Sequence, residues 1–211
     1  MGFFRGASRL DRALDAFARR DWRTARRMLE KATAQERRAA GDYHLGLLHW
    51  RGLGGKRDAA AAVACFQRAA EHGHAAAQTA YGIALREGVG VEKDTDAAIA
   101  CFRSAVGAGD GDAMVELAAM SAPEEAHRLL QRAADMGHPP AMARFADLLM
   151  ATNPKKALKW LYADVALSGD ENARQRAASL AREMRADEID AAQRAGRAYA
   201  KSIERRLKGL E

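Results

Sequence analysis

The 211-residue chain contains two cysteines, four prolines and only 6% aromatic residues. Two cysteines are too few for the disulfide framework of a small secreted protein. No segment approaches the roughly 18 consecutive apolar residues that a membrane-spanning helix requires. The N-terminus carries charges where a secretory signal needs its apolar run. These absences lead us to expect a cytoplasmic protein with no membrane span.

The four prolines all lie after residue 120, at positions where a helix would start. Pro123 and Pro154 fit the first helical turn, where the missing amide proton is not needed. Apolar residues make up 48% of the chain, and many of them are alanine, the strongest helix former. The composition therefore favours closely packed helices over sheets.

A 36-residue repeat is the clearest pattern in the sequence. Matched residues are Leu45/Tyr81, Gly46/Gly82, Gly52/Gly88, Gly54/Gly90, Asp58/Asp94, Ala62/Ala98, Val63/Ile99, Cys65/Cys101, Phe66/Phe102, Ala69/Ala105 and Gly73/Gly109. A shorter form continues downstream to Gly137 and Gly169, without the Gly-rich loop between its two helices. Repetition at this length is typical of arrays of helix pairs.

These residues resemble the Sel1-like repeat family, relatives of tetratricopeptide repeats. The family consensus places Leu-Gly, a Gly-x-Gly loop, Asp, an aromatic pair and a closing Gly in this order. The resemblance covers about residues 21 to 200 and is strongest in the two 36-residue units. It implies a bacterial adaptor or scaffold that binds other proteins and is not an enzyme. Some secreted members pair two cysteines within each repeat, so one cysteine per repeat agrees with a cytoplasmic location.

Local signals predict the same helices. Side-chain N-caps are expected at Asp58, Asp94, Asn153, Asp170 and Asp187, and left-handed helix ends at the four closing glycines. Together with apolar residues at helical spacing, they predict twelve helices, over residues 8–19, 22–35, 39–51, 58–72, 75–87, 94–108, 111–120, 123–136, 139–151, 154–168, 171–184 and 187–207.

We expect an all-α fold, an α/α superhelix (solenoid) of stacked antiparallel helix pairs, because one pair cannot bury its own apolar faces. Residues 1–38 are expected to form a degenerate N-terminal helix pair with a basic surface. Residues 39–169 would hold the Sel1-like repeats, and residues 170–211 a C-terminal capping pair. Because no linker divides the sequence, a single continuous domain is expected.

No residue pattern indicates a catalytic site, a cofactor or a metal. Cys65 and Cys101 would be too far apart on stacked helices for a disulfide, and no basic residue adjoins either sulfur in sequence. His44 and His49 are five residues apart, which does not fit a metal-binding pair on one helix. The Gly-rich loops follow helices and lack the Gly-Lys-Ser/Thr of a phosphate loop. We predict reduced cysteines that serve packing.

The first helix of each repeat is expected to carry the binding surface. In tetratricopeptide-like pairs, positions beside the Leu-Gly pair line a concave groove. The resulting candidates for binding a protein or peptide are Tyr43, Leu47, Trp50, Arg51, Thr79, Ile83, Arg86 and Glu87. Trp, Tyr and Arg are frequent interface anchors. The alternative is that Tyr43 or Trp50 packs against the N-terminal unit.

Charge is distributed unevenly. Residues 1–57 carry 14 Lys or Arg against 6 Asp or Glu, residues 58–170 are net acidic, and residues 171–211 are net basic. The basic ends favour a second hypothesis, in which the N-terminal region and the last helix bind nucleic acid or another acidic surface. Nucleic acid is the less favoured partner, because aromatic residues do not interleave with these charges as base stacking requires.

The two ends of the chain offer further contact surfaces. The last helix is expected to place Ile189, Ala192, Tyr199, Ile203 and Leu207 on one face and Arg194, Arg197, Lys201, Arg205 and Lys208 on the other. A terminal cap with a solvated basic face explains this pattern, and docking of that face to a partner is the alternative. Phe3 and Phe4 are too apolar for a free tail, so they pack on the first unit or belong to an interface.

Overall fold

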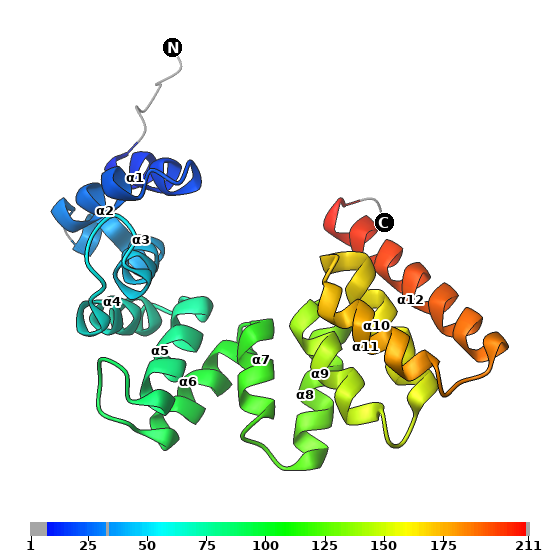
Figure 1. Ribbon diagram of the computed structural model, residues 1–211. Helices are drawn as coiled ribbons and strands as arrows, with labels where there is room; N and C mark the ends of the chain where they lie inside the picture. Colours follow the sequence, from blue (N-terminus) through cyan, green and yellow to red (C-terminus); the bar gives the residue numbers. More distant parts are fainter. Residues whose placement is uncertain (1–7, 33, 210–211) are drawn as a thin grey trace. The chain divides into compact units, whose positions relative to one another are not determined.

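The computed structural model describes residues 8–32 and 34–209, and these ranges contain helices and turns but no strand (Figure 1). The helices are α1 (Arg9–Ala18), α2 (Trp22–Lys31), α3 (Ala34–Arg51), α4 (Ala59–Glu71), α5 (Ala75–Glu87), α6 (Thr95–Gly107), α7 (Gly111–Ala118), α8 (Pro123–Asp135), α9 (Pro139–Leu149), α10 (Pro154–Ser168), α11 (Glu171–Ala181) and α12 (Ala186–Leu207). The predicted all-α class with twelve helices is confirmed.

The largest boundary difference lies between α2 and α3. The sequence predicted a helix to residue 35 and a new one from 39, whereas α2 ends at Lys31 and α3 starts at Ala34. The cause at the end of α2 is Ala32, whose backbone is extended with ψ of 144°. Within α3, Arg38 has non-helical angles, φ 52° and ψ −177°, so this helix is kinked near the expected start.

Most predicted helix ends are confirmed. Asp58 and Asp94 accept a hydrogen bond of 2.9 Å from the amide three residues on, and Asn153 caps α10 in the same way. Asp170 caps α11, and the four closing glycines all have positive φ. The prediction for Asp187 was wrong, because α12 already begins at Ala186 with Arg185 at the N-cap position. Asp187 instead lies in the first turn, where its negative charge favours the helix dipole.

The contacts divide the chain into two compact units, Met1–Ala113 and Met114–Glu211, which are described separately. The division falls inside α7, between two successive residues of one helix. The boundaries expected near residues 38 and 169, and the expected single continuous domain, stay predictions.

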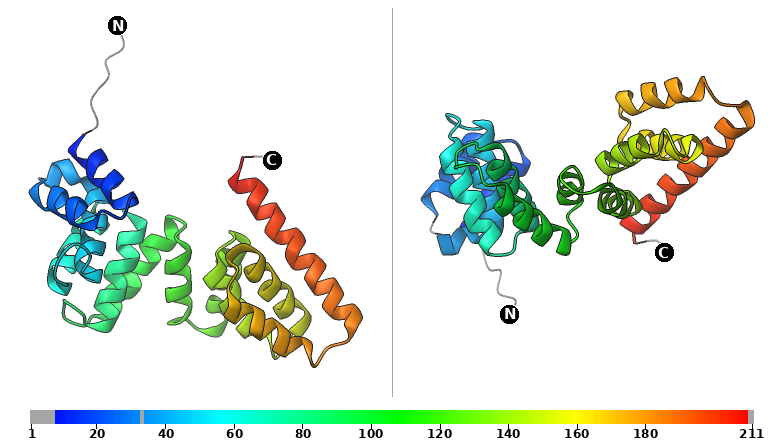
Figure 2. Two further views of the ribbon diagram at one scale, coloured as in Figure 1. Left: turned by 45° about the horizontal axis from the view of Figure 1, so that its top comes forward. Right: turned by 90° about the horizontal axis from the view of Figure 1, so that it is seen from below.

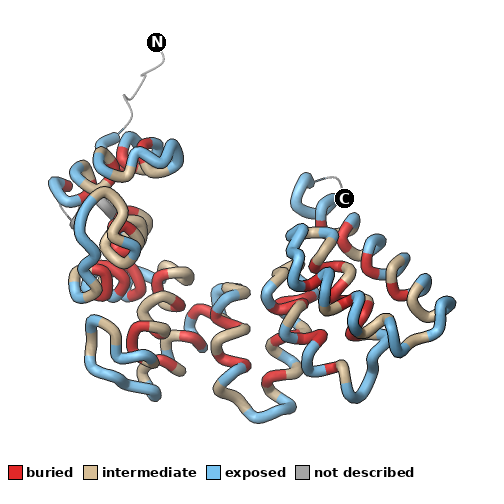
Figure 3. Tube along the Cα trace, viewed as in Figure 1, coloured by how far each residue is buried: buried red, intermediate tan, exposed pale blue. Residues whose placement is uncertain are grey.

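In the first unit each helix from α1 to α5 packs on the next helix in the chain, and α1 also packs on α3. The buried residues of this unit, drawn red in Figure 3, are mainly alanine, leucine and phenylalanine. A Cβ added to Gly46 would lie 2.5 Å from the Phe66 ring, and one added to Gly82 would lie 2.7 Å from the Phe102 ring. The repeated glycine therefore lets the aromatic ring of the second helix lie directly on the backbone of the first.

The Gly-rich loops contact the preceding helix pair. A Cβ at Gly54 would lie 2.4 Å from the carbonyl oxygen of Trp22, the first residue of α2. A Cβ at Gly90 would lie 2.5 Å from the carbonyl oxygen of Ala59, the first residue of α4. Each loop thus lies against the start of the second helix of the previous pair. This repeated contact explains why successive helix pairs are packed at the same distance from one another.

In the second unit α10 is the central helix, and α9, α11 and α12 all pack against it (Figure 2). The helices α8 and α9 also pack on each other. The connection from α9 to α10 spans only residues 150–153, which agrees with the predicted loss of the Gly-rich loop. Because one helix contacts three others, the C-terminal part of the chain forms a compact cluster.

The last helix, α12, is held by specific contacts along its length. Gly196 lies close to the backbone of α10, since a Cβ there would be 2.7 Å from the Lys159 carbonyl oxygen. The Tyr199 hydroxyl donates a 2.8 Å hydrogen bond to the Ala134 carbonyl oxygen at the end of α8. Lys159 lies over the rings of Trp160 and Tyr199, at 4.5 and 5.2 Å from the centroids. These contacts bind α12 to both α8 and α10.

The faces of α12 largely follow the prediction. Ala192 and Ile203 are buried, Tyr199 is half-buried, and the predicted basic residues are exposed. Leu207, expected on the packed face, is instead 81% exposed at the last residue of α12. Phe3 and Phe4 lie outside the described residues.

Candidate binding surface

The eight candidate residues form four repeat-equivalent pairs on α3 and α5, each pair 36 residues apart. They are Tyr43/Thr79, Leu47/Ile83, Trp50/Arg86 and Arg51/Glu87. The structure places all of them on first helices of the repeats, within one compact unit. Their environments differ from pair to pair, so they are not equally available to a partner.

Tyr43 is half-buried and contributes mainly to packing. Its ring stacks on His74 with centroids 4.6 Å apart, and it packs against Ala69, Ala70 and Ala77. Burial raises the pKa of the Tyr43 phenol, and the charge of Asp110 raises it further. Tyr43 therefore packs against α4 and α5, the elements that follow it, and not against the N-terminal helix pair proposed as the alternative.

Trp50 is half-buried at the end of α3. One side of its ring approaches Phe66, with centroids 6.1 Å apart, and the Arg57 guanidinium lies 5.6 Å from its centroid. The ring is therefore preorganised by the core and by a cation, and part of its surface remains accessible. A preorganised aromatic side chain loses little conformational entropy when it binds a partner.

Thr79 is unsuited to partner binding. It is only 4% exposed, and its hydroxyl donates either to the Ala75 carbonyl oxygen at 3.2 Å or to the Asp110 carboxylate at 3.1 Å. The same Asp110 oxygen accepts the Ala113 amide at 2.8 Å. The side chain thus links α5 to the start of α7. The helical position of Thr79 was predicted correctly, but its side chain faces the interior.

The remaining candidates lie at or near the surface. Leu47 and Ile83 are half-buried, and Arg51 and Glu87 are exposed. The Arg86 guanidinium contacts the Glu87 carboxylate at 3.1 Å. The accessible part of the surface therefore combines two aliphatic side chains, one aromatic ring and charges of both signs.

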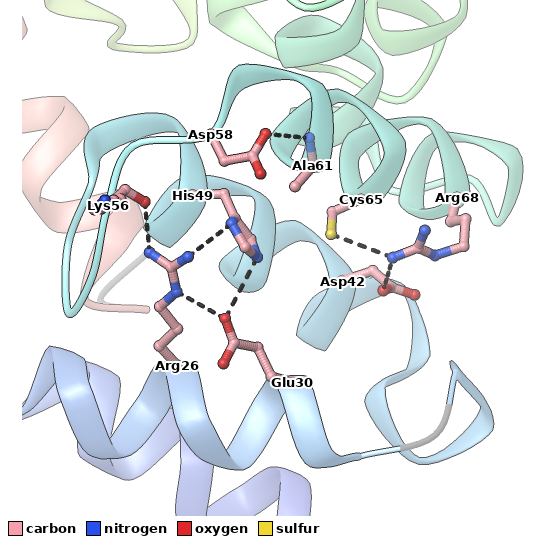
Figure 4. A network of polar contacts seen from close by, with 9 residues as sticks. All are labelled: Arg26, Glu30, Asp42, His49, Lys56, Asp58, Ala61, Cys65 and Arg68. Atoms are coloured by element: carbon pink, nitrogen blue, oxygen red, sulfur yellow. Dashed lines mark hydrogen bonds and ion pairs between the residues drawn. The ribbon is translucent and has the colours of Figure 1, made fainter.

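A polar network not predicted from the sequence joins α2 to α3 (Figure 4). Arg26 donates to Glu30 at 2.8 Å, to the Lys56 carbonyl oxygen at 2.9 Å and to His49 Nδ1 at 3.1 Å. Burial lowers the pKa of His49, and the charge of Arg26 lowers it further, against the opposing effect of Glu30. Because an arginine can only donate, Nδ1 of His49 is the acceptor and the ring is neutral in this arrangement.

A second network surrounds Cys65. The Arg68 guanidinium lies 3.2 Å from the Cys65 sulfur and 3.0 Å from the Asp42 carboxylate, which is 4% exposed. No basic residue adjoins Cys65 in sequence, but Arg68, one helical turn away on the same face, brings a guanidinium to the sulfur, a contact that sequence adjacency does not reveal. Both cysteines are thiols, as predicted. Burial raises the pKa of the Cys101 thiol, which disfavours the reactive thiolate.

A basic hollow between α1 and α2 was also missed. It is lined by Arg9, Arg12, Arg27, Met28 and Lys31. The sequence contains its signal, basic residues three or four positions apart on two successive helices. The overall charge of the N-terminal region was recognised, but the sequence alone does not show which basic side chains meet.

Neither a metal-binding cluster nor a helix able to cross a membrane occurs among the described residues. They include no group of three or more His, Cys, Asp or Glu side chains arranged to hold a metal ion. Within the same ranges no helix is both long and apolar enough to cross a membrane.

Comparison with known proteins identifies the family. The Sel1 repeat model matches residues 39–74, 75–110, 112–138 and 147–163, which together make up more than half of the chain. The first two matches coincide with the two 36-residue units. The chain therefore belongs to the Sel1 repeat family, as its resemblance predicted. Proteins of this family generally mediate protein–protein interactions and are typically non-catalytic scaffolds.

Two solved structures share the fold. A Sel1 repeat protein from Oxalobacter formigenes is 24% identical with a TM-score of 0.64, over 80% of this chain and 74% of that one. The protein c5321 is described as a protective antigen of uropathogenic Escherichia coli strains displaying an SLR fold. It is 16% identical with a TM-score of 0.57, over 96% of this chain and 56% of that one. No curated protein gives a significant match.

Proposed function

We propose that this protein is a non-enzymatic adaptor that binds a protein or peptide partner with the first-helix surface of its two regular repeats. We define the first-helix surface as Leu47, Trp50 and Arg51 of α3 with Ile83, Arg86 and Glu87 of α5. The proposal rests on the family's general role and on the accessible residues that α3 and α5 present.

One observation carries the choice of surface. Trp50 is held by Phe66 and Arg57 but keeps part of its ring accessible, and its repeat equivalent is the half-buried Arg86. Tryptophan and arginine are the residues most enriched among interface hot spots. A rigid aromatic anchor with a neighbouring guanidinium favours binding of a peptide with both apolar and acidic side chains.

We further propose that the protein is bacterial and cytoplasmic and that it has no catalytic activity. The buried side chains are predominantly apolar, and the described residues include no group of three or more His, Cys, Asp or Glu arranged to hold a metal ion. Adaptors of this kind act by bringing proteins together.

Trp50→Ala and Arg86→Glu are each expected to weaken partner binding by about 2 kcal/mol or more, the scale of an interface hot spot. The first change removes the aromatic anchor, and the second reverses the charge at the equivalent position of the next repeat. Both affinities are measured by isothermal titration calorimetry against a partner first isolated with the unaltered chain. That difference corresponds to roughly 30-fold in Kd.

Arg103→Glu is the matched control, because Arg103 is exposed on the second helix α6 and its change reverses the same charge. Its affinity should stay within about 0.5 kcal/mol of the original, as is usual for surface substitutions. Normal binding by both Trp50→Ala and Arg86→Glu would contradict the proposal. A large fall in melting temperature for Trp50→Ala would assign Trp50 to the core instead.

A further inference from the structure

The basic hollow between α1 and α2 has a volume of about 590 Å³. Arg9 and Arg12 line it from α1, and Arg27 and Lys31 line it from α2. Residues at these spacings lie on one face of a helix, so the two helices turn basic faces toward the same space. Met28 is the apolar residue of the lining, half-buried and packed against the core of this unit.

The acidic side chains of both helices are engaged elsewhere. Asp11 accepts a hydrogen bond from a backbone amide at the start of α1, and Asp21 does the same at the start of α2. Asp15 binds Arg19, the C-cap residue of α1, and Glu30 binds Arg26 of α2. These four are the acids of residues 8–32, and none of them lines the hollow.

Among the described residues, no acidic side chain lines the hollow. The side chains of Arg12, Arg27 and Lys31 make no hydrogen bond or ion pair with any described residue. Arg26, their neighbour outside the hollow, instead makes several polar contacts at once. Several cations around one open space repel one another, and a bound polyanion would relieve that repulsion.

We propose that the basic hollow docks an acidic protein segment that carries an apolar side chain between its carboxylates. Arginine pairs with carboxylates in bidentate geometry, and the flexible thioether of Met28 adapts to an apolar side chain. No aromatic ring lines the hollow to stack on unpaired bases, which favours an acidic protein over single-stranded nucleic acid. This inference rests on the proposed protein-binding function and adds a site separate from the first-helix surface.

The test is fluorescence anisotropy with a short labelled peptide that has carboxylates on both sides of a central leucine. The Arg12→Glu/Arg27→Glu double variant should weaken binding at least about tenfold, because two charge-assisted contacts become repulsive. Arg23→Glu is the matched control, since Arg23 is exposed on α2 and lies outside the hollow. It should change the affinity by no more than about twofold, as expected for an exposed charge.

Further variants test the apolar contact of Met28 and distinguish the hollow from the first-helix surface. Met28→Ser should weaken binding of the leucine peptide more than that of a peptide with serine at its centre. All hollow variants are also measured in a Trp50→Ala/Arg86→Glu background, in which the first-helix surface is disabled, and their losses of affinity should be the same there, so binding to that surface does not count for or against the hollow. Circular dichroism melting checks that each variant folds, and Arg12→Gln/Arg27→Gln replaces the double variant if it does not.

Three results would overturn the inference. Equal losses in the double variant and in Arg23→Glu would show a diffuse charge attraction in place of a site. Tighter binding of a single-stranded oligonucleotide than of the peptide at the same salt concentration would reassign the hollow to nucleic acid. Absence of peptide binding at low salt, where such contacts are strongest, would remove the site altogether.

Discussion

Replacing Phe102 by alanine is expected to lower the free energy of unfolding by about 3 to 5 kcal/mol. Phe102 is fully buried, and its ring lies directly on the backbone of α5 at Gly82. Removing the ring leaves a cavity that the helix backbones cannot fill without separating from their neighbours. Urea denaturation followed by circular dichroism measures the change.

Two control variants show whether the destabilisation comes from the lost volume of the Phe102 ring. Phe102→Leu keeps most of the apolar volume and should cost clearly less than the alanine variant. Arg103→Ala, an exposed change one residue away, should cost at most about 0.5 kcal/mol. If Phe102→Ala and Arg103→Ala had similar stability, the aromatic residue of the repeat would not be the packing element described above.

The second large effect is expected at Gly90, where alanine should destabilise the protein by roughly 2 to 5 kcal/mol. Gly90 has φ of 77°, and a left-handed conformation costs an alanine about 1 to 2 kcal/mol. Its new Cβ would also lie 2.5 Å from the Ala59 carbonyl oxygen, and such overpacking typically adds about 1 to 3 kcal/mol. Thermal and urea denaturation both measure this difference.

Gly73→Ala separates the two contributions. Gly73 has the same φ of 77°, but nothing lies within 4 Å of an added Cβ. This variant should therefore show the conformational cost alone, about 1 to 2 kcal/mol. Equal destabilisation by Gly90→Ala and Gly73→Ala would mean that the loop does not press against α4 and that the contact between successive units is unimportant.

The fold could be predicted in detail because the same residues set both local and repeat structure. Asp58 and Asp94 are N-caps whichever helices surround them, and Gly73 and Gly109 end helices through their own backbone conformation. Phe66 and Phe102 recur at the position where a second helix meets a glycine. These features depend on nearby residues, so a single sequence contains the information.

Predictions that depended on side-chain environment were less accurate. Thr79 shares a helical position with Tyr43, yet its small hydroxyl side chain turns inward to Asp110. Arg68 was not recognised as a neighbour of Cys65 because the contact needs the rotamer of a long side chain. The basic hollow depends on how α1 and α2 pack, which spacing on either helix alone does not determine.

The first-helix surface was predictable only in part. Its helices follow from the repeat, whereas its accessible residues follow from packing, which left Trp50 half-exposed and buried Thr79. Partner identity depends on a second molecule whose sequence is independent of this chain. The accessible residues therefore indicate the binding surface and the chemical character of a suitable partner. The partner itself is identified by experiment.

Site-directed photo-crosslinking tests the central claim, that the first helices bind a protein partner. A photoreactive amino acid is introduced at Arg51 or Glu87, which are exposed on first helices, and as controls at Ala64 or Ala100, which are exposed on second helices. The account predicts the same crosslinked protein from both first-helix positions and none from the control positions. Crosslinking of that protein only from the second-helix positions would contradict it.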